Sequence, residues 1–196
     1  MYDNMKRIII AFIASILCVV QSMAQDDKVG VLKNAFVKRD WQTFADSFPV
    51  TFAEFLDLYG YDASEGEPNP LYNEGYDHIF FLFSNERIRE DYYLRKLLRL
   101  TEGYEWDADA PNYLRENVRI LIENYPSLMS EFMKDKPDMQ VKDFLKCAIA
   151  TPYPGPEHSQ NYNRYLSTIE LYEDYSSKIV RLLKEAHLEL MKEWEE

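Results

Sequence analysis

Apolar residues recur at helical spacing along most of the chain. Leu114, Val118, Leu121 and Ile122 follow the i, i+4, i+7, i+8 positions of one helical face, and the last 38 residues hold two further stripes of this kind. The alternation of apolar and polar residues that is typical of a half-buried strand occurs nowhere. The pattern therefore predicts an all-α fold, a single compact multi-helix domain of about eight helices.

Polar caps, glycines and prolines predict where these helices begin and end. Thr51 and Glu54 form a capping box, and the helix they open should end at Tyr59 with Gly60 as a left-handed cap. Asp40 should cap a short helix that stops before Pro49. Further helices are expected over 73–83 and 87–100, from Asp107 or Asp109 to Pro126, over 128–133, and from the cap Asp138 to Ala148, with a bend at 175–177 in the C-terminal segment.

The segment between 61 and 83 is the most ambiguous part of this assignment. Residues 61–73 should form an ordered loop, because Gly66, Pro68 and Pro70 interrupt any regular structure. The apolar run 79–83 has the composition of a buried strand. Since strand alternation is absent elsewhere, we interpret it as part of a buried helix over 73–83.

The first 24 residues have the organisation of a signal peptide. Lys6 and Arg7 precede an apolar run over 8–20, and Ala24 ends a small-residue exit before Gln25. Met5 is an alternative start to Met1. The run is shorter than the ~20 residues of a membrane-spanning helix. We therefore expect a signal peptide over 1–24, a mature domain over 25–196 without a transmembrane segment, and a periplasmic or secreted location.

The two cysteines do not predict a disulfide in the exported protein. Cys18 lies within the expected signal peptide, where Leu17 precedes it instead of the small residue that lipidation normally requires. Cys147 is the only cysteine after the expected cleavage point, and its helical spacing from Phe144 indicates a packed thiol. Soluble export is favoured over a lipid anchor.

The charge balance argues against nucleic acid as a partner. The chain has 22 basic and 34 acidic residues among 196, with a net charge of -12, whereas a nucleic-acid binder needs a basic surface to replace phosphate counterions. Its 46% hydrophobic content is that of an ordinary globular protein.

Catalytic and metal-binding signatures are lacking. Glu74 and His78 have i, i+4 spacing, but zinc sites usually need three or four ligands, and neither HExxH nor a nucleophile elbow is present. We expect no metal, no cofactor and no enzymatic activity.

Aromatic residues gather beside acidic ones in segments that read as loops. Tyrosine and tryptophan bury a large area at small entropic loss, and neighbouring carboxylates steer a basic partner, so this combination favours protein recognition. The alternative is a purely structural role, in which the aromatic rings fill the core and the acidic side chains keep the surface soluble. The candidate partner-binding residues are Tyr59, Tyr61, Asp62, Glu65, Glu67, Tyr72, Tyr104, Trp106 and Asp107.

Three short motifs follow one another in a distinctive order within residues 47–110. The Phe-Pro segment at 48–49 is followed by Leu-Tyr-Gly-Tyr-Asp at 58–62 and Pro-Leu-Tyr at 70–72. This order resembles an uncharacterised family of small secreted all-α proteins of gut bacteria, which in turn resemble immunity partners of antibacterial toxins. No chemistry is attached to the motif, so no functional residue is transferred.

Two functional hypotheses follow. The first is an exported, non-catalytic binding protein, specifically an immunity protein that neutralises a toxin in the periplasm through its acidic-aromatic loops. The second is a glycan-binding protein or hydrolase whose cleft combines scattered carboxylates with His78. A scaffold role is a third reading, and the oligomeric state is left open.

Overall fold

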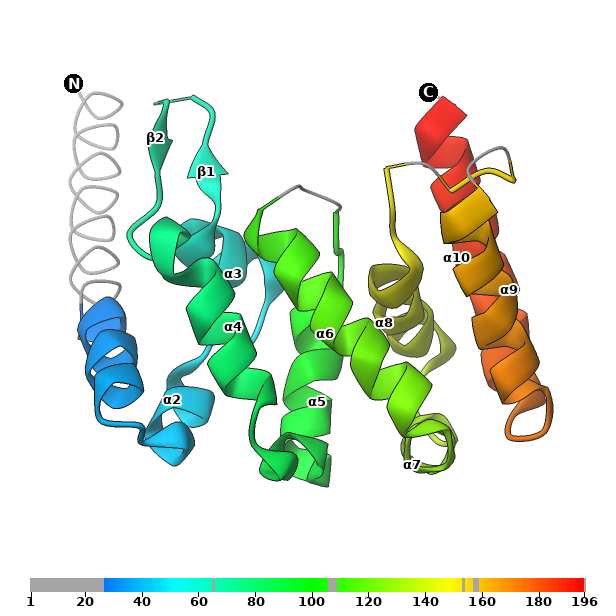
Figure 1. The fold of residues 1–196 in the computed structure, drawn as a ribbon, viewed down its shortest axis with the longest axis horizontal. Helices are drawn as coiled ribbons and strands as arrows, with labels where there is room; N and C mark the ends of the chain where they lie inside the picture. Colours follow the sequence, from blue (N-terminus) through cyan, green and yellow to red (C-terminus); the bar gives the residue numbers. More distant parts are fainter. Residues whose placement is uncertain (1–26, 65, 106–108, 153, 157–158, 196) are drawn as a thin grey trace, which may run out of the picture. The chain divides into compact units, whose positions relative to one another are not determined.

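The computed structural model describes residues 27–64, 66–105, 109–152, 154–156 and 159–195 (Figure 1). The expected signal peptide and Cys18 therefore lie outside the described residues. The chain divides into two compact units, Met1–Phe48 and Pro49–Glu196, which are described separately. The expectation of one domain over 25–196 stays a prediction.

The smaller unit contains two described helices, over 27–37 and in α2 (Trp41–Ser47). Asp40 caps α2 as predicted, because its carboxylate accepts a hydrogen bond from the Thr43 amide at 3.1 Å. Leu32 and Phe44 are fully buried.

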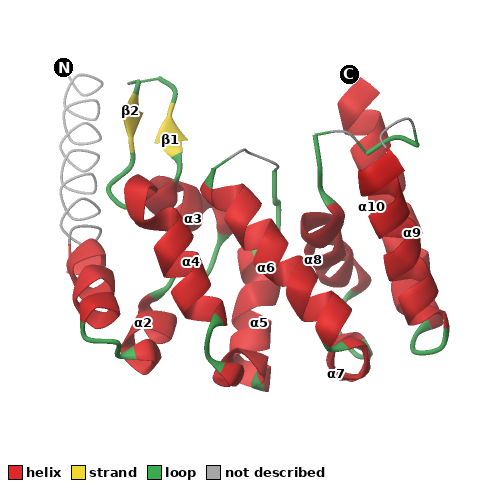
Figure 2. Cartoon of the chain, in the orientation of Figure 1, coloured by secondary structure: helices red, strands yellow, loops and turns green. Residues whose placement is uncertain are grey.

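The larger unit is a succession of helices interrupted by one small hairpin, shown in yellow in Figure 2. Its first helix begins at the predicted capping box, where Thr51 Oγ1 accepts from the Glu54 amide at 3.2 Å and Glu54 Oε2 accepts from the Val50 amide at 2.9 Å. The elements are α3 (Phe52–Tyr59), β1 (Tyr61–Asp62), β2 (Glu67–Pro68), the 3₁₀ turn η1 (Tyr72–Glu74), α4 (Gly75–Phe83), the 3₁₀ turn η2 (Glu86–Arg89), α5 (Asp91–Leu100), α6 (Ala110–Asn124), α7 (Pro126–Met133), α8 (Asp138–Ile149), α9 (Ser159–Glu173) and α10 (Ser177–Glu195).

Helices α6 and α8 hold this unit together. Helix α6 packs against α4 and α8, while α8 also packs against α5 and α10, and α9 packs on α10 (Figure 1). The buried face of α6 includes Leu114 and Val118, and that of α8 includes Phe144. The Tyr172 hydroxyl donates to the Ile122 carbonyl at 3.0 Å, which joins α9 to the end of α6. This packing fixes the positions of the side chains discussed below.

The all-α prediction is confirmed, and the helix count is corrected. Helix makes up 75% of the structure and strand 2%, with about ten helices rather than eight among the described residues. The ambiguous run 79–83 is helical, as we interpreted it, and the C-terminal bend lies between α9 and α10.

Three predicted helix starts need correction, two of them because tertiary contacts engage the expected capping side chains. Asp138 is the first residue of α8 rather than its cap, and its carboxylate pairs with Lys178 at 3.2 Å and with Arg181 at 2.5 Å. Asp109 occupies the cap position of α6 but makes no cap hydrogen bond. The helix expected from Arg87 begins only at Asp91, after the η2 turn.

Gly60 ends α3, but it is not a left-handed cap. Its φ of -82° and ψ of -172° are extended. A Cβ at this position would lie 2.7 Å from the Leu56 carbonyl oxygen, so the glycine is explained by close approach to the last helical turn.

Among the described residues, no helix has the length and apolar character needed to cross a membrane.

Candidate functional site

The predicted loop after Gly60 contains an antiparallel hairpin of two-residue strands, β1 and β2. The Asp62 carboxylate holds its turn by accepting from the Ser64 amide at 2.8 Å and from the Ser64 hydroxyl at 2.6 Å. Gly66 has a φ of 73°, and its carbonyl accepts from the Tyr61 hydroxyl at 2.7 Å. At the base, the Asn69 amide donates to the Gly60 carbonyl at 3.1 Å. The hairpin is therefore held by bonds of its own, which present Asp62 and Glu67 at the surface.

Tyr72 joins this hairpin to the start of α6. The ring of Tyr61, half of which is exposed, contacts the Tyr72 ring edge-on with centroids 6.0 Å apart. The Tyr72 hydroxyl donates to Asp109 Oδ2 at 2.6 Å. This bond spans 37 residues of sequence and brings two of the acidic-aromatic segments together.

The outer face of α4 extends the same surface. Tyr76 and Phe80 are stacked with centroids 6.4 Å apart, and they are 58% and 59% exposed. Tyr113, one turn after Asp109 on α6, packs its ring against Tyr76 at 5.3 Å. Large apolar rings that stay exposed while contacting one another are a feature of interaction surfaces.

We call this continuous set of side chains the aromatic-acidic surface. Side-chain contacts link Tyr61 to Tyr72 and Asp109, and link Tyr113 to Tyr76 and Phe80, while the first turn of α6 joins Asp109 to Tyr113. Asp62 and Glu67 belong to it through the backbone pairing of the hairpin. It consists of Tyr61, Asp62, Glu67, Tyr72, Tyr76, Phe80, Asp109 and Tyr113.

The sequence prediction missed Tyr76, Phe80 and Tyr113. The i, i+4 spacing of Tyr76 and Phe80 on a predicted helix was the available signal, but the run 79–83 reads as buried throughout. In the structure Ile79, Phe81 and Leu82 are buried, and Phe80 faces outward.

Two predicted partner-binding residues belong to the core instead. Tyr59 has no exposed surface, stacks on Phe55 at 5.2 Å and bonds to His78 Nδ1 through its hydroxyl at 3.0 Å. Tyr104 is 4% exposed, and its hydroxyl donates to the Pro111 carbonyl at 3.3 Å. Because neither ring reaches the surface, a partner cannot contact either one in this conformation. The other predicted residues Glu65, Trp106 and Asp107 lie outside the described residues.

His78 does not offer the exposed ring that the glycan-cleft hypothesis requires. It is 1% exposed, and its Nδ1 bonds to Tyr59 as described above. Burial raises the pKa of Tyr59 well above its ordinary value, so this phenol is neutral at physiological pH. The pair holds α3 against α4 and is part of the core.

Metal and thiol chemistry find no support in the described part of the chain. No group of three or more histidine, cysteine, aspartate or glutamate side chains there is arranged to hold a metal ion. Cys147 is fully buried, and burial raises the pKa of its thiol far above the ordinary value. A thiol in such a site is protonated and poorly nucleophilic.

Comparison of the chain with known protein families, with curated proteins and with solved structures gave no match.

Proposed function

We propose that this protein is a non-catalytic binding protein that recognises a basic protein partner through its aromatic-acidic surface. The observation that carries the proposal is the continuity of that surface. Tyr61, Tyr76 and Phe80 are each at least half exposed while their rings contact neighbouring rings. The bond from Tyr72 to Asp109 holds the Tyr72 ring that Tyr61 contacts.

The rings supply the apolar part of the proposed interface. An exposed aromatic ring that is already held by its neighbours loses little conformational freedom on binding. The stacked Tyr76 and Phe80 rings meet this condition, since Tyr113 packs against the same pair. Tyrosine is among the residues most often found at binding hot spots.

The carboxylates supply steering toward a basic partner. Glu67 is exposed on β2, and Asp62 lies beside it across the hairpin. The chain's net charge of -12 adds a long-range field of the same sign. Such fields raise the association rate with oppositely charged proteins, and salt weakens them.

The specific partner we propose is an antibacterial toxin, neutralised by occlusion of its basic catalytic surface in the periplasm. The acidic charge and the aromatic-acidic surface support this proposal, as does the resemblance over residues 47–110 to a family of small secreted proteins. Export by the expected signal peptide would place the protein where such a toxin acts.

The test is affinity capture from an envelope extract of the source organism at low and high salt, followed by binding kinetics with the captured protein. The variant pair Asp62→Asn and Glu67→Gln removes two charges from the hairpin and keeps the acceptor oxygen that Asp62 uses in the turn. Glu170→Gln with Glu173→Gln is the matched control, because it makes the same change in net charge at exposed positions of α9.

We expect the hairpin variant to associate about threefold or more slowly at low salt, with the difference shrinking as salt rises. The α9 control should change the rate much less. Equal slowing by both variants would show that only net charge matters and would reject the hairpin as the site. Failure to capture any protein at either salt would count against the proposed function as a whole.

A further inference from the structure

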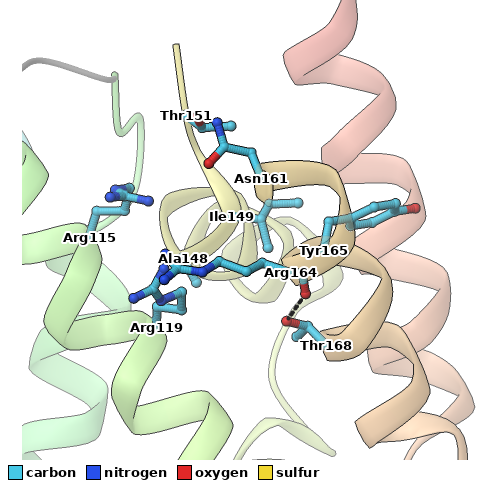
Figure 3. Close-up of a pocket in the computed structure, with 9 residues that line it drawn as sticks. All are labelled: Arg115, Arg119, Ala148, Ile149, Thr151, Asn161, Arg164, Tyr165 and Thr168. Atoms are coloured by element: carbon cyan, nitrogen blue, oxygen red, sulfur yellow. Dashed lines mark hydrogen bonds between the residues drawn. The ribbon is translucent and has the colours of Figure 1, made fainter. Parts of the chain in front are cut away.

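A second, separate feature of the larger unit is a small cavity lined by three arginines. Arg115 and Arg119 project from α6, and Arg164 extends across from α9 toward Arg119 (Figure 3). Ala148 and Ile149 of α8 form part of the wall. Three positive charges around one cavity are unexpected in a chain whose net charge is -12.

Every guanidinium nitrogen of the first arginine, Arg115, makes a hydrogen bond. Arg115 donates from Nε and Nη2 to Asn112 Oδ1 at 3.0 and 2.9 Å and from Nη1 to the Ala150 carbonyl at 3.1 Å. It also pairs with Glu116. Only 13% of its side chain is exposed, so these bonds fix the guanidinium at the cavity wall.

The other two guanidinium groups have donors to spare. Arg119 pairs with Glu116 through Nη2, but its buried Nε donates to no acceptor and lies 3.6 Å from Glu123 Oε1. Only 13% of the Arg119 side chain is exposed. Among the described residues, none makes a hydrogen bond or an ion pair with the Arg164 guanidinium. A buried donor without an acceptor is unfavourable unless something outside the chain accepts from it.

The carboxylates around the cavity do not neutralise all of the arginine charges. Among the described residues, Glu116 and Glu123 are the carboxylates paired with these arginines, which leaves one positive charge in excess there. Burial lowers the pKa of Arg119; the positive charges of Arg164 and Arg115 lower it further, while the two carboxylates raise it. Like charges held close together in a partly buried site repel one another, and an anion between them relieves this repulsion.

We propose that this cavity binds a small oxyanion (phosphate, sulfate or carboxylate) between Arg119 and Arg164. Guanidinium groups present several donors in a planar fork that matches such anions. The cavity volume is about 20 Å³, room for roughly one or two waters. A larger ligand would therefore have to keep all but its anionic group outside. The cavity shares α6 with the aromatic-acidic surface but none of its residues. Its proposed ligand goes beyond the proposed function.

Isothermal titration with inorganic phosphate, sulfate and acetate, each against chloride at constant ionic strength, tests this site. We expect saturable binding of at least one of these anions with one site per chain, and an anion-dependent rise in Tm. A comparison of the affinities for the two inorganic anions with the affinity for acetate shows whether the site prefers phosphate or sulfate groups or prefers carboxylates.

The variant Arg164→Gln carries the decisive comparison, because this exposed side chain can be changed without disturbing a described ion pair. It should weaken anion binding at least about tenfold and leave the Tm without anion unchanged or higher, since one repelling charge is removed. Arg99→Gln, an exposed arginine on α5 away from the cavity, is the matched control and should bind as the wild type does. Equal affinity of Arg164→Gln and wild type, or no anion binding beyond chloride, would overturn the proposal.

Discussion

Replacing Gly60 by alanine should destabilise the protein through one close contact. The added Cβ would lie 2.7 Å from the Leu56 carbonyl oxygen and 3.3 Å from the Leu56 carbonyl carbon and Cα. All three are backbone atoms of the last turn of α3, which cannot rotate away as a side chain would. The same carbonyl oxygen accepts from the Gly60 amide at 2.8 Å, so the shift must also strain that bond.

The magnitude follows from two opposing effects. Forcing an extra methyl group into a filled site costs about 1–3 kcal/mol. Alanine also reduces the entropy of the unfolded chain, which offsets about 0.4–1 kcal/mol. The backbone at Gly60 is extended, so alanine carries no conformational penalty there. We expect a net loss of about 1.5 kcal/mol, which in a chain of this size lowers Tm by roughly 3–6 °C.

Thermal and urea unfolding followed by circular dichroism measure this effect, with Gly30→Ala as the matched control. Gly30 lies in the helix over 27–37 with no atom near its would-be Cβ, so alanine there should stabilise by about 0.5–1 kcal/mol. Gly60→Asn distinguishes the two explanations for this glycine. Asparagine is tolerated in a left-handed cap, but its Cβ would meet the Leu56 carbonyl as that of alanine does, so the variant should also be destabilised. A Gly60→Ala protein as stable as the wild type would refute the reasoning.

Two further predictions concern ionisable groups. Hydrogen bonds from Arg181 and, to a smaller extent, Lys178 hold the pKa of Asp138 below its ordinary value. The stability that these bonds give the folded protein is therefore complete above the unfolded pKa of about 4. It is lost as the pH falls through the lower pKa of the folded state. Asp138→Asn should therefore flatten the acid limb of a Tm–pH profile, and an unaltered limb would contradict this. Cys147 should resist thiol reagents in the native protein and react once urea unfolds the chain, because its thiol is buried. The mass of the peptide that contains Cys147 measures this labelling. Rapid labelling of the native protein would contradict the burial of the thiol.

Local rules predicted the starts of α2 and α3 correctly. The caps at Asp40 and Thr51 form as expected because each bond joins residues only three apart in the sequence. The same rule failed for Asp138, whose carboxylate is taken by residues of α10 about 40 positions away. A capping pattern describes what a side chain can do locally, while tertiary packing decides what it does.

The candidate surface was only partly predictable for the same reason. Composition pointed to the hairpin and to Tyr72, but the burial of Tyr59 depends on α4 supplying His78 opposite its hydroxyl. Exposure of Phe80 likewise depends on which side of α4 is covered by α6. Neither partner helix is specified by the residues around the ring itself.

The arginine cavity lies beyond sequence reasoning altogether. Arg115 and Arg119 are one turn apart and read as an ordinary polar stripe on α6. Arg164 comes from α9, and only the packing of the larger unit brings it to the same cavity.

The central claim is that the exposed rings of the aromatic-acidic surface bind the partner, and the affinity of a ring-deleted variant tests it most directly. The captured partner would be titrated with wild type, with Tyr76→Ala combined with Phe80→Ala, and with Tyr92→Ala. Tyr92 is the matched control, since it is 61% exposed on α5 and lies outside the surface. All three rings are exposed, so their removal should leave Tm nearly unchanged.

The account predicts that the double variant binds at least about 30-fold more weakly, the loss expected when a hot spot worth about 2 kcal/mol is removed. Tyr92→Ala should bind as tightly as the wild type. Undiminished affinity of the double variant, with its fold intact, would contradict the claim and place the interface elsewhere on the chain.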